Sequence, residues 1–396
     1  MDVDDDARTT GRRLRQIRQA RRKSLRVVAG LAGISAGHLS RIENGERALD
    51  RRSLIVALAD ALQVAPSELT KLPVPTSSNG DGDAVKAVRR ALIAVSRDDP
   101  AGQVIPVDVL RTRVESLVTA QRQCQHERVG RALPGLIADL HTSIASGRDV
   151  QELLAVAALL HVQGSHAFLG DMGATADLCW QAALLARRAA REHGGADVIG
   201  LAVFGAANGL LAAGEFGTAQ DELDSVTVPT TSPESMQLAG MLALSRSLVA
   251  AADKRPGDMA APLEQAAELA VRTGDGNAYW LGFGSTNVGV WRMSVALEAG
   301  DHPRAVAVAE TLHPELLPSA TRQATYWANY GRALARIRGR HDDAVRALRK
   351  AELISPARVQ RHPFVRDVIA ELVTRSRQDA VGRELRGMAY RAGLPV

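Results

Sequence analysis

The segment LRVVAGLAGISAGHLSRIENGER, residues 25–47, limits the possible folds more than any other part of the chain. Two short helices that cross at a tight turn need a small residue where they touch and a flexible residue at the turn. Ala29 and Gly33 meet these needs four residues apart, and glycine adopts a positive φ without a Cβ clash. The segment therefore predicts a helix-turn-helix unit. Its inner faces are expected to carry Val28, Ala32, Ile34, Leu39 and Ile42.

The second helix of this unit, about residues 35–43, has the features of a helix that enters the major groove of DNA. Ser35 is a favourable N-cap, and the short side chains that follow it let the backbone lie deep in the groove. Arg41 and His38 are longer and reach further. The residues expected to face DNA are Ser35, Ala36, Gly37, His38, Ser40 and Arg41.

Basic residues are concentrated in the same part of the chain. Residues 1–72 contain 14 Lys or Arg against 9 Asp or Glu, which accounts for the net charge of +5 of the whole chain. A basic block at residues 12–26 contains no acid; a solvated face or a disordered arm is one explanation of such a block. However, Leu14, Ile17 and Leu25 interleave at helical spacing, and a folded basic face attracts DNA phosphates. The residues of this block assigned to DNA are Arg12, Arg13, Lys23, Ser24 and Arg26, and we expect Arg12, Arg13 and Lys23 to contact phosphates whatever the base sequence.

Residues 10–72 resemble the Xre-type, lambda-repressor-like helix-turn-helix domain, because the ending RIENGER and the run LADALQVAPSEL match that family closely. The resemblance implies a five-helix domain that binds double-stranded operator DNA, usually as a homodimer on a palindrome. It also implies an ion pair between Arg18 of the first helix and Glu43 of the third. Ala36 and Gly37 depart from the amide side chains that some members use to contact bases. The expected helices cover residues 12–22, 25–32, 35–43 and 52–62, with a short fifth helix from Pro66.

The whole chain is expected to be all-α and to divide in two. Ala and Leu are abundant and β-branched runs are scarce, and 396 residues exceed the size of a single core. The polar segment PVPTSSNGDGDA predicts a linker at residues 73–84, between a DNA-binding domain at 1–72 and a helical domain at 85–396. We expect no membrane-spanning stretch and no signal peptide, and Cys124 and Cys179 show no paired spacing. These features predict a cytoplasmic protein.

A repeat of about 40 residues runs through the C-terminal part. At five positions a glycine followed by a charged residue ends a helical stretch, and Ala219, Ala305 or Ala344 follows three of these glycines at a distance of five residues. The pattern resembles the tetratricopeptide repeat, in which a glycine separates two helices and a small residue lets them pack closely. The resemblance implies a helical solenoid with a concave groove, and a generic helical bundle is the alternative. The glycines are Gly170, Gly214, Gly257, Gly300 and Gly339.

In the tetratricopeptide register, the positions 13, 10, 6 and 3 residues before each turn glycine face the groove. Asn287, Asn329 and Asn208 occupy such positions, although asparagine is a poor helix former. A side-chain amide both donates and accepts, as it must to hold an extended peptide backbone. Capping within the fold is the alternative for the asparagines, and core packing is the alternative for nearby aromatic residues. The residues expected to bind a ligand are Phe204, Asn208, Asn287, Trp291, Tyr326 and Asn329.

The sequence contains no phosphate-binding glycine loop, nucleophile elbow or metal-ligand pair. We therefore expect neither an enzyme nor a bound cofactor or metal. An Xre-type head followed by tetratricopeptide-like repeats resembles the RRNPP group of peptide-responsive regulators. That resemblance implies a homodimeric quorum-sensing regulator whose groove binds a signal peptide or another small effector. The alternative is a regulator whose repeats recruit a protein partner without any small effector.

Overall fold

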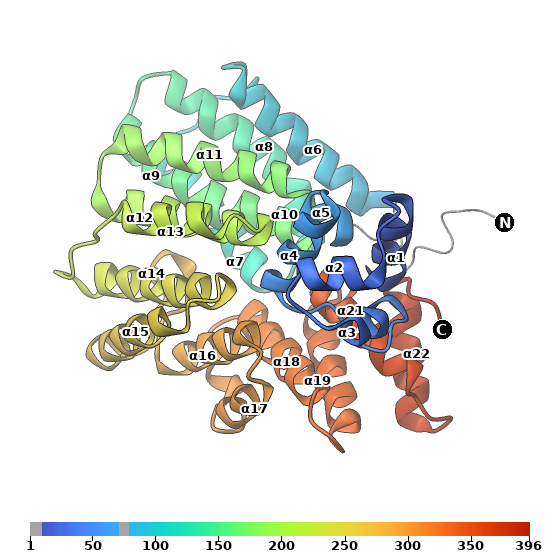
Figure 1. The fold of residues 1–396 in the computed structure, drawn as a ribbon. Coiled ribbons are helices and arrows are strands. Elements are labelled where there is room, and N and C mark those ends of the chain that lie inside the picture. Colours follow the sequence, from blue (N-terminus) through green and yellow to red (C-terminus); the bar gives the residue numbers. More distant parts are fainter. Residues whose placement is uncertain (1–9, 71–78) are drawn as a thin grey trace.

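The computed structural model describes residues 10–70 and 79–396, and the regular structure within them is helical (Figure 1). The expected all-α class is therefore confirmed. Residues 10–70, called the head from here on, contain α1 (Thr10–Ala20), α2 (Leu25–Leu31), α3 (Ala36–Glu43), α4 (Arg52–Leu62) and α5 (Pro66–Thr70). Residues 79–396, called the repeat region, contain α6 (Asn79–Ser96), α7 (Val107–Arg122), α8 (His126–Ala145), α9 (Val150–Leu159), the π-helical η2 (Leu160–His166), α10 (Ala167–Asp171), α11 (Ala176–His193), α12 (Ala196–Ala213), α13 (Phe216–Asp224), α14 (Pro233–Ala252), η3 (Pro256–Asp258), α15 (Ala260–Thr273), η4 (Ala278–Trp280), α16 (Ser285–Ala299), α17 (His302–Glu310), η5 (Pro314–Leu316), α18 (Ala320–Leu334), α19 (His341–Ile354), α20 (Pro356–Arg361), α21 (Pro363–Thr374) and α22 (Ala380–Arg391).

The head folds as the sequence predicts. Gly33 has a φ of +70° and links α2 to α3, while Ala29 is buried where these helices touch. Ser24 and Ser35 cap α2 and α3, because each hydroxyl oxygen accepts a hydrogen bond from the backbone N–H three residues further on. Four of the five expected inner-face residues belong to one small core that holds the head together, and Ile34 is partly buried and packs against it.

The expected ion pair between Arg18 and Glu43 is present. Nε and Nη2 of Arg18 donate to the two carboxylate oxygens of Glu43 over 2.6 and 2.7 Å. Arg18 also donates to the carbonyl oxygen of Lys23 over 3.0 Å. A shielded, bidentate pair of this kind is stronger than an exposed one, so it fixes α3 firmly against α1.

In the repeat region, helices that follow one another pack together in pairs. Gly214, Gly300 and Gly339 have φ values of +88°, +83° and +79°, and each lies between two such helices. Glycine is favoured there because this left-handed conformation clashes with a Cβ. The small residues five positions further on, which let the paired helices approach, are all fully buried: Ala219, Ala305 and Ala344.

The repeat pattern is wrong at its other two glycines. Gly170 lies inside α10, and the left-handed turn comes three residues later, at Gly173 with a φ of +69°. Gly257 lies in the short helix η3, and the left-handed residue is Lys254 with a φ of +58°. At both places a neighbouring residue already makes the turn that the pattern assigned to the glycine.

The repeat region curves until two distant parts of it meet (Figure 1). Thr321 of α18 donates to the carbonyl oxygen of Arg122 at the end of α7 over 3.0 Å. Arg358 of α20 pairs with Asp171 of α10 over 2.8 Å. These contacts join segments 199 and 187 residues apart. The head lies against this curve and contacts it through the loop between α3 and α4, as described below.

The predicted linker at residues 73–84 is too long at its C-terminal end. Residues 79–84 form the first turns of α6. The rest of the predicted linker and residues 1–9 lie outside the described residues.

Two helical stretches are long and apolar enough to span a membrane by length and composition, contrary to expectation. They are Val150–Asp171 and Ala196–Ala213. In their most apolar windows, 72% and 61% of the residues are buried inside the fold. Packing in the core of the repeat region therefore accounts for their apolar character.

Candidate DNA-binding surface and central cavity

Helix α3 lies on the outer surface of the head, with its N-terminal half open to solvent. Leu39 and Ile42 anchor its other face in the core. Among the described residues, no atom other than those of its chain neighbours and its own helix backbone lies within 4 Å of the position that a Cβ on Gly37 would take. A DNA backbone can therefore approach this end of the helix closely. The six residues predicted to face DNA, all wholly or partly exposed, are Ser35, Ala36, Gly37, His38, Ser40 and Arg41.

The surroundings of His38 disfavour its charged form. Burial lowers the pKa of His38 below its ordinary value, and the neighbouring cations Arg47, Arg41 and Arg51 lower it further. The imidazole is therefore suited to a hydrogen bond with a base or a phosphate, and Arg41 is the cation of this helix that faces outward.

The basic block contains residues that the head itself holds and residues that face solvent. Arg13 pairs with Glu68 over 2.9 Å, and Nζ of Lys23 donates to the carbonyl oxygen of Ala61 over 2.5 Å. Arg13 and Lys23 thus tie the start of the head to its end, a role that the sequence did not reveal. Their assignment to DNA phosphates stays a prediction. Of the residues of this block that were assigned to DNA, Arg12, Ser24 and Arg26 are exposed, and so are the further basic residues Arg15, Arg21 and Arg22.

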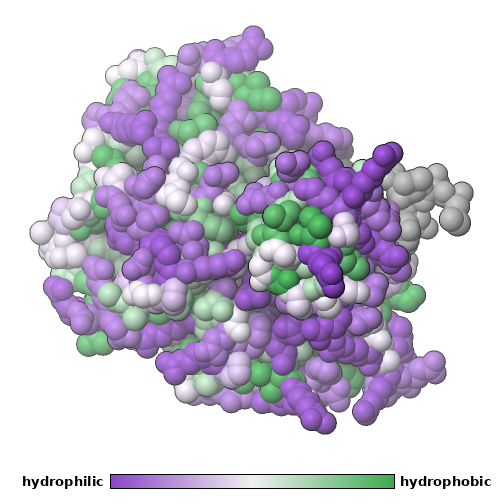
Figure 2. Space-filling model, viewed as in Figure 1, coloured by the Kyte–Doolittle hydropathy of each residue, from purple (hydrophilic) through white to green (hydrophobic). Residues whose placement is uncertain are grey.

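Apolar side chains also reach the surface of the head. Val27 and Leu31 of α2 are 51% and 64% exposed. Figure 2 shows an apolar group over the head, surrounded by mostly hydrophilic side chains. Such a patch suits contact with another protein surface.

Buried ion pairs dock the loop between α3 and α4 on the repeat region. Arg336 donates to Asp50 over 2.7 Å and also to Glu371 of α21, and its side chain is 1% exposed. Glu371 accepts a further hydrogen bond from the backbone N–H of Ala48 over 2.8 Å. Burial opposes ionisation of Asp50, but Arg336 and Arg332 outweigh it and hold the pKa of Asp50 below its ordinary value. Asp50 therefore stays charged in contact with its partners.

Two further carboxylates of the repeat region bind the head. Glu298 of α16 accepts from the backbone N–H and the guanidinium of Arg52, both over 2.6 Å. Asp367 of α21 accepts from the Thr10 hydroxyl over 2.7 Å and from the N–H of Leu49 over 3.3 Å. Burial raises the pKa of Asp367 to about 7. We call these contacts the head–repeat seam: Thr10, Ala48, Leu49, Asp50 and Arg52 of the head with Glu298, Arg332, Arg336, Asp367 and Glu371 of the repeat region.

Two turn glycines of the repeats also make room for the head. A Cβ on Gly214 would lie 2.6 Å from Cγ2 of Val56, and a Cβ on Gly300 would lie 2.9 Å from Nη1 of Arg51. Any side chain at Gly214 would therefore press on α4. The same residues thus serve the turns of the repeats and the docking of the head.

The repeat region and the head together line a central cavity of about 290 Å³. Residues of η2, α12, α16 and α18 form much of its wall. Arg52 of the head forms another part of the wall. A molecule bound in this cavity would therefore touch both parts of the protein.

The cavity contains part of the predicted ligand site. Phe204 and Asn208 line it from α12, Trp291 from α16 and Asn329 from α18. Asn329 donates to the Ser294 hydroxyl over 2.9 Å. Counting back from the turn glycines therefore located Phe204, Asn208 and Asn329 at one cavity, and Trp291, predicted as a nearby aromatic residue, lies there too.

Asn287 and Tyr326 were placed wrongly in this site. Asn287 is 2% exposed, and its amide donates to the carbonyl oxygen of Gly282, just before its own helix, over 2.8 Å. Tyr326 is 4% exposed, and its hydroxyl donates to the carbonyl oxygen of Ala309 over 3.0 Å. Both side chains are used inside the fold, so the clamp of three asparagines on one groove is wrong.

The sequence patterns did not indicate the most polar part of the cavity wall. Arg122, Arg322, Arg332 and Arg358 line the cavity from α7, α18 and α20. These helices meet only because the repeat region closes on itself. The one local signal is that Arg122 ends its helix and Arg322 lies in the first turn of its helix, where ring closure brings helix ends together.

Comparison with known proteins bears on the head alone. Residues 10–72 match the family model described as a helix-turn-helix domain. No curated protein and no solved structure matches the chain. The chain therefore consists of a helix-turn-helix domain followed by a large all-helical region, and the domain suggests DNA binding and transcriptional regulation.

Proposed function

We propose that this protein is a transcriptional regulator that binds operator DNA through its head and changes its DNA affinity when a small ligand occupies the central cavity. One observation carries the proposal. Arg52 begins α4 of the head and also forms part of the cavity wall. A ligand there would have different contacts when the head is docked and when it is not, and such a difference is what lets a ligand shift an equilibrium.

The DNA-binding half of the proposal rests on the family match at residues 10–72 and on the exposure of α3. In helix-turn-helix domains the second helix of the motif enters the major groove. The proposal includes a cytoplasmic homodimer on a palindromic operator, as the Xre-type resemblance implies. Docked heads would then have a fixed separation and orientation on the DNA.

The ligand half rests on the size and position of the cavity. A volume of about 290 Å³ lies just below the range of about 300–1,000 Å³ found for small-molecule sites, so it suits a ligand at the small end of that range. The head also covers part of this space. A small molecule therefore fits better than an extended signal peptide, which would need the head to move aside.

Recruitment of a protein partner, without any small effector, is the second candidate function. The exposed apolar residues Val27 and Leu31 favour it, because exposed apolar patches are typical of protein–protein contacts. This function needs no change in DNA affinity when small molecules are added.

The test begins with selection of bound sequences from a random duplex library. Fluorescence anisotropy then gives the operator affinity with and without a filtered small-molecule fraction of a lysate from the cells that make the protein. We expect a change of about 5- to 150-fold, the usual range of allosteric coupling. Two results together would favour the second candidate over our proposal. The operator affinity would stay constant, and the immobilised complex of the protein with its operator would retain a specific protein.

A further inference from the structure

Five arginines surround the central cavity. They come from the head and from three helices of the repeat region. Among the described residues that line the cavity, Glu298 is the one acidic side chain. The wall therefore carries a large excess of positive charge. The arginines are Arg52, Arg122, Arg322, Arg332 and Arg358.

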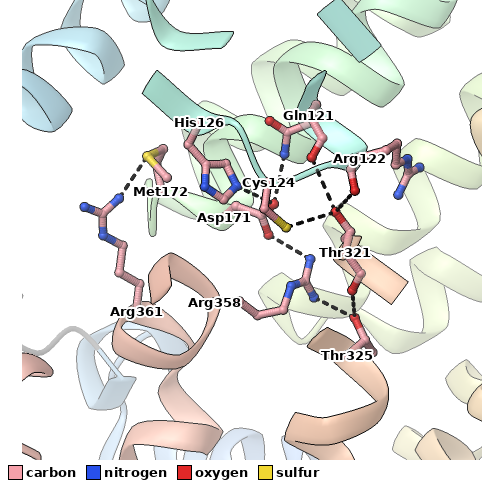
Figure 3. A network of polar contacts seen from close by, with 10 residues as sticks. All are labelled: Gln121, Arg122, Cys124, His126, Asp171, Met172, Thr321, Thr325, Arg358 and Arg361. Atoms are coloured by element: carbon pink, nitrogen blue, oxygen red, sulfur yellow. Dashed lines mark hydrogen bonds and ion pairs between the residues drawn. The ribbon is translucent and has the colours of Figure 1, made fainter. Parts of the chain in front are cut away.

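Two of these arginines are neutralised by acids. Arg52 pairs with Glu298 over 2.6 Å. Arg358 pairs with Asp171 over 2.8 Å and donates to Thr325 over 3.1 Å, and Figure 3 shows it reaching both residues. These two cations need no further counter-ion.

The other three arginines have no acid within ion-pair distance among the described residues. Arg122 donates to the neutral side chain of Gln163. Arg332 donates to Asn329 over 2.9 Å and to the backbone carbonyl of Asp50 over 3.0 Å. The guanidinium of Arg322 packs 5.3 Å from the centre of the Trp291 ring. Three buried charges thus share one cavity with no carboxylate of the described residues in direct contact, although Asp171 acts on Arg122, and Asp50 and Glu298 act on Arg332, from further away.

Hydrogen-bonding groups around the cavity are also left without partners. Among the described residues, no group accepts a hydrogen bond from the buried Nε of Arg122, Arg322, Arg332 or Arg358. Nε1 of Trp291, which also lines the cavity, is a buried donor without an acceptor among the described residues. Buried donors of this kind are rare, and each destabilises a fold unless something else accepts from it. Because these donors line one cavity, a single acceptor bound there would satisfy several of them at once.

The three unneutralised arginines remain charged at neutral pH. Burial lowers the pKa of Arg122 and of Arg332 to about 10, although nearby acids oppose it. Burial, with repulsion from Arg122 and Arg358, lowers the pKa of Arg322 to about 9. The fold therefore holds cations that repel one another, which an anion between them would relieve.

We propose that the central cavity binds a small molecule with at least two anionic groups, phosphates or carboxylates, held by Arg122, Arg322 and Arg332. The inference rests on the proposed function and specifies the chemistry of its ligand. Guanidinium groups match both kinds of anion through paired N–H donors. Phe204 and Trp291 form an apolar wall against which the body of the molecule packs.

Such an anion is coupled to the head through residues that belong to both sites. Arg332 binds the backbone of Asp50 in the head–repeat seam and also lines the cavity. Arg52 of the head lines it as well. An anion held by Arg332 therefore acts on the residue that binds the head at Asp50, and Arg52 of the docked head completes the wall around it.

Inorganic pyrophosphate and citrate serve as probes of the two ligand chemistries. Isothermal titration with each gives binding, and differential scanning fluorimetry gives the melting temperature, with sodium chloride at equal ionic strength as control. We expect saturable binding of at least one probe and a melting temperature that rises with its concentration by mass action. The probe that binds more tightly identifies the anionic group. If sodium chloride raised the melting temperature as much as the probes did, and neither probe bound saturably, the inference would be overturned.

Arg322→Gln tests the site directly, with Arg292→Gln as matched control. Arg292 lies on α16 and pairs at the surface with Glu264. We expect Arg322→Gln to raise the melting temperature without probe, since it removes a repelled cation, and to abolish the probe-induced rise. Arg292→Gln should keep that rise. A purely structural Arg322 would instead lower the melting temperature in Arg322→Gln and leave the probe-induced rise intact, which would also overturn the inference.

Operator anisotropy with the bound probe separates this inference from the proposed function. If a probe binds the wild type but not Arg322→Gln, and operator affinity stays constant in both, the anion site stands and ligand-responsive regulation fails. If neither probe binds, yet the small-molecule fraction of the lysate still changes operator affinity, the anion site fails and the regulator stands.

Discussion

The outer surface of the head and the interior around the central cavity are both rich in arginine, but the two groups of arginines are in opposite environments. Arg26 and Arg41 are exposed to solvent on the head. Arg322, Arg332 and Arg336 have buried guanidinium atoms, and the whole side chain of Arg336 is 1% exposed. The first group keeps its hydration, whereas the second has lost most of it.

This difference determines what each group can recognise. Exposed cations attract any polyanion over a distance of about one Debye length, and salt weakens that attraction. Buried cations destabilise the fold until a partner with matching geometry neutralises them. Arg336 has that partner in Asp50 and Glu371, whereas Arg322 has none among the described residues. The head is therefore suited to a long polyanion, and the cavity to a small and specific anion.

Removal of a buried, neutralised cation should have the largest effect. Arg336→Ala leaves Asp50 and Glu371 in the seam without their shared partner, and breaking a buried pair in this way typically costs about 3–5 kcal/mol. We expect the head to undock while the repeat region stays folded. The backbone N–H of Ala48 donates a hydrogen bond to Glu371, and its hydrogen exchange should become much faster.

Arg338→Ala is the control for that experiment, because Arg338 lies two residues away and is exposed. It should leave exchange at Ala48 unchanged. If Arg336→Ala also left this exchange unchanged, the buried charges would not be what docks the head, and the contrast between the two groups of arginines would lose its energetic basis.

Removal of an exposed cation should have a smaller effect, confined to DNA. Arg41→Ala should weaken operator binding by about 1–3 kcal/mol if Arg41 contacts a base, with no loss of head docking. Arg26→Gln is the companion variant. It should weaken operator and random duplexes alike and reduce the slope of log affinity against log salt by about one. Anisotropy at several salt concentrations measures both, and full operator affinity in Arg41→Ala would remove α3 from base contact.

The head could be predicted closely because its determinants are local. Gly33, Ser35 and the pair Arg18–Glu43 lie within one short segment, and turn, cap and ion pair all agree on one register. The cavity could be predicted only in part. Counting back from a turn glycine succeeds for Asn208 and Asn329, which lie six and ten residues before their glycines.

The same count fails thirteen residues before the turn, at Asn287 and Tyr326. Asn287 lies in the first turn of α16 and Tyr326 in the middle of α18, and the chain before each helix offers a competing partner: the carbonyl groups of Gly282 and Ala309. The arginines of the cavity wall had no sequence signal as a group, because the closure of the repeat region alone brings α7, α18 and α20 together. Local sequence patterns therefore predict the helices, whereas the long-range closure of the repeat region determines which residues line the cavity.

The smallest effect should come from the one seam carboxyl that titrates near neutral pH. Burial raises the pKa of Asp367 to about 7, well above its value of about 3.9 in an unfolded chain. A carboxyl with a raised pKa stabilises the fold fully below its unfolded pKa, and this contribution is lost as the pH rises towards its folded pKa. Between pH 6 and 8 the free energy of unfolding of the wild type should fall by about 1 kcal/mol relative to that of Asp367→Asn, whose side chain cannot ionise but still accepts from Thr10.

The neighbouring charges, Arg366 and Asp50, are the same in the wild type and in Asp367→Asn. The change with pH in the difference between the unfolding free energies of these two proteins therefore isolates Asp367. A difference that stays constant from pH 6 to 8 would mean that Asp367 is ionised throughout, like Asp50, and that the seam holds two buried carboxylates of the same kind.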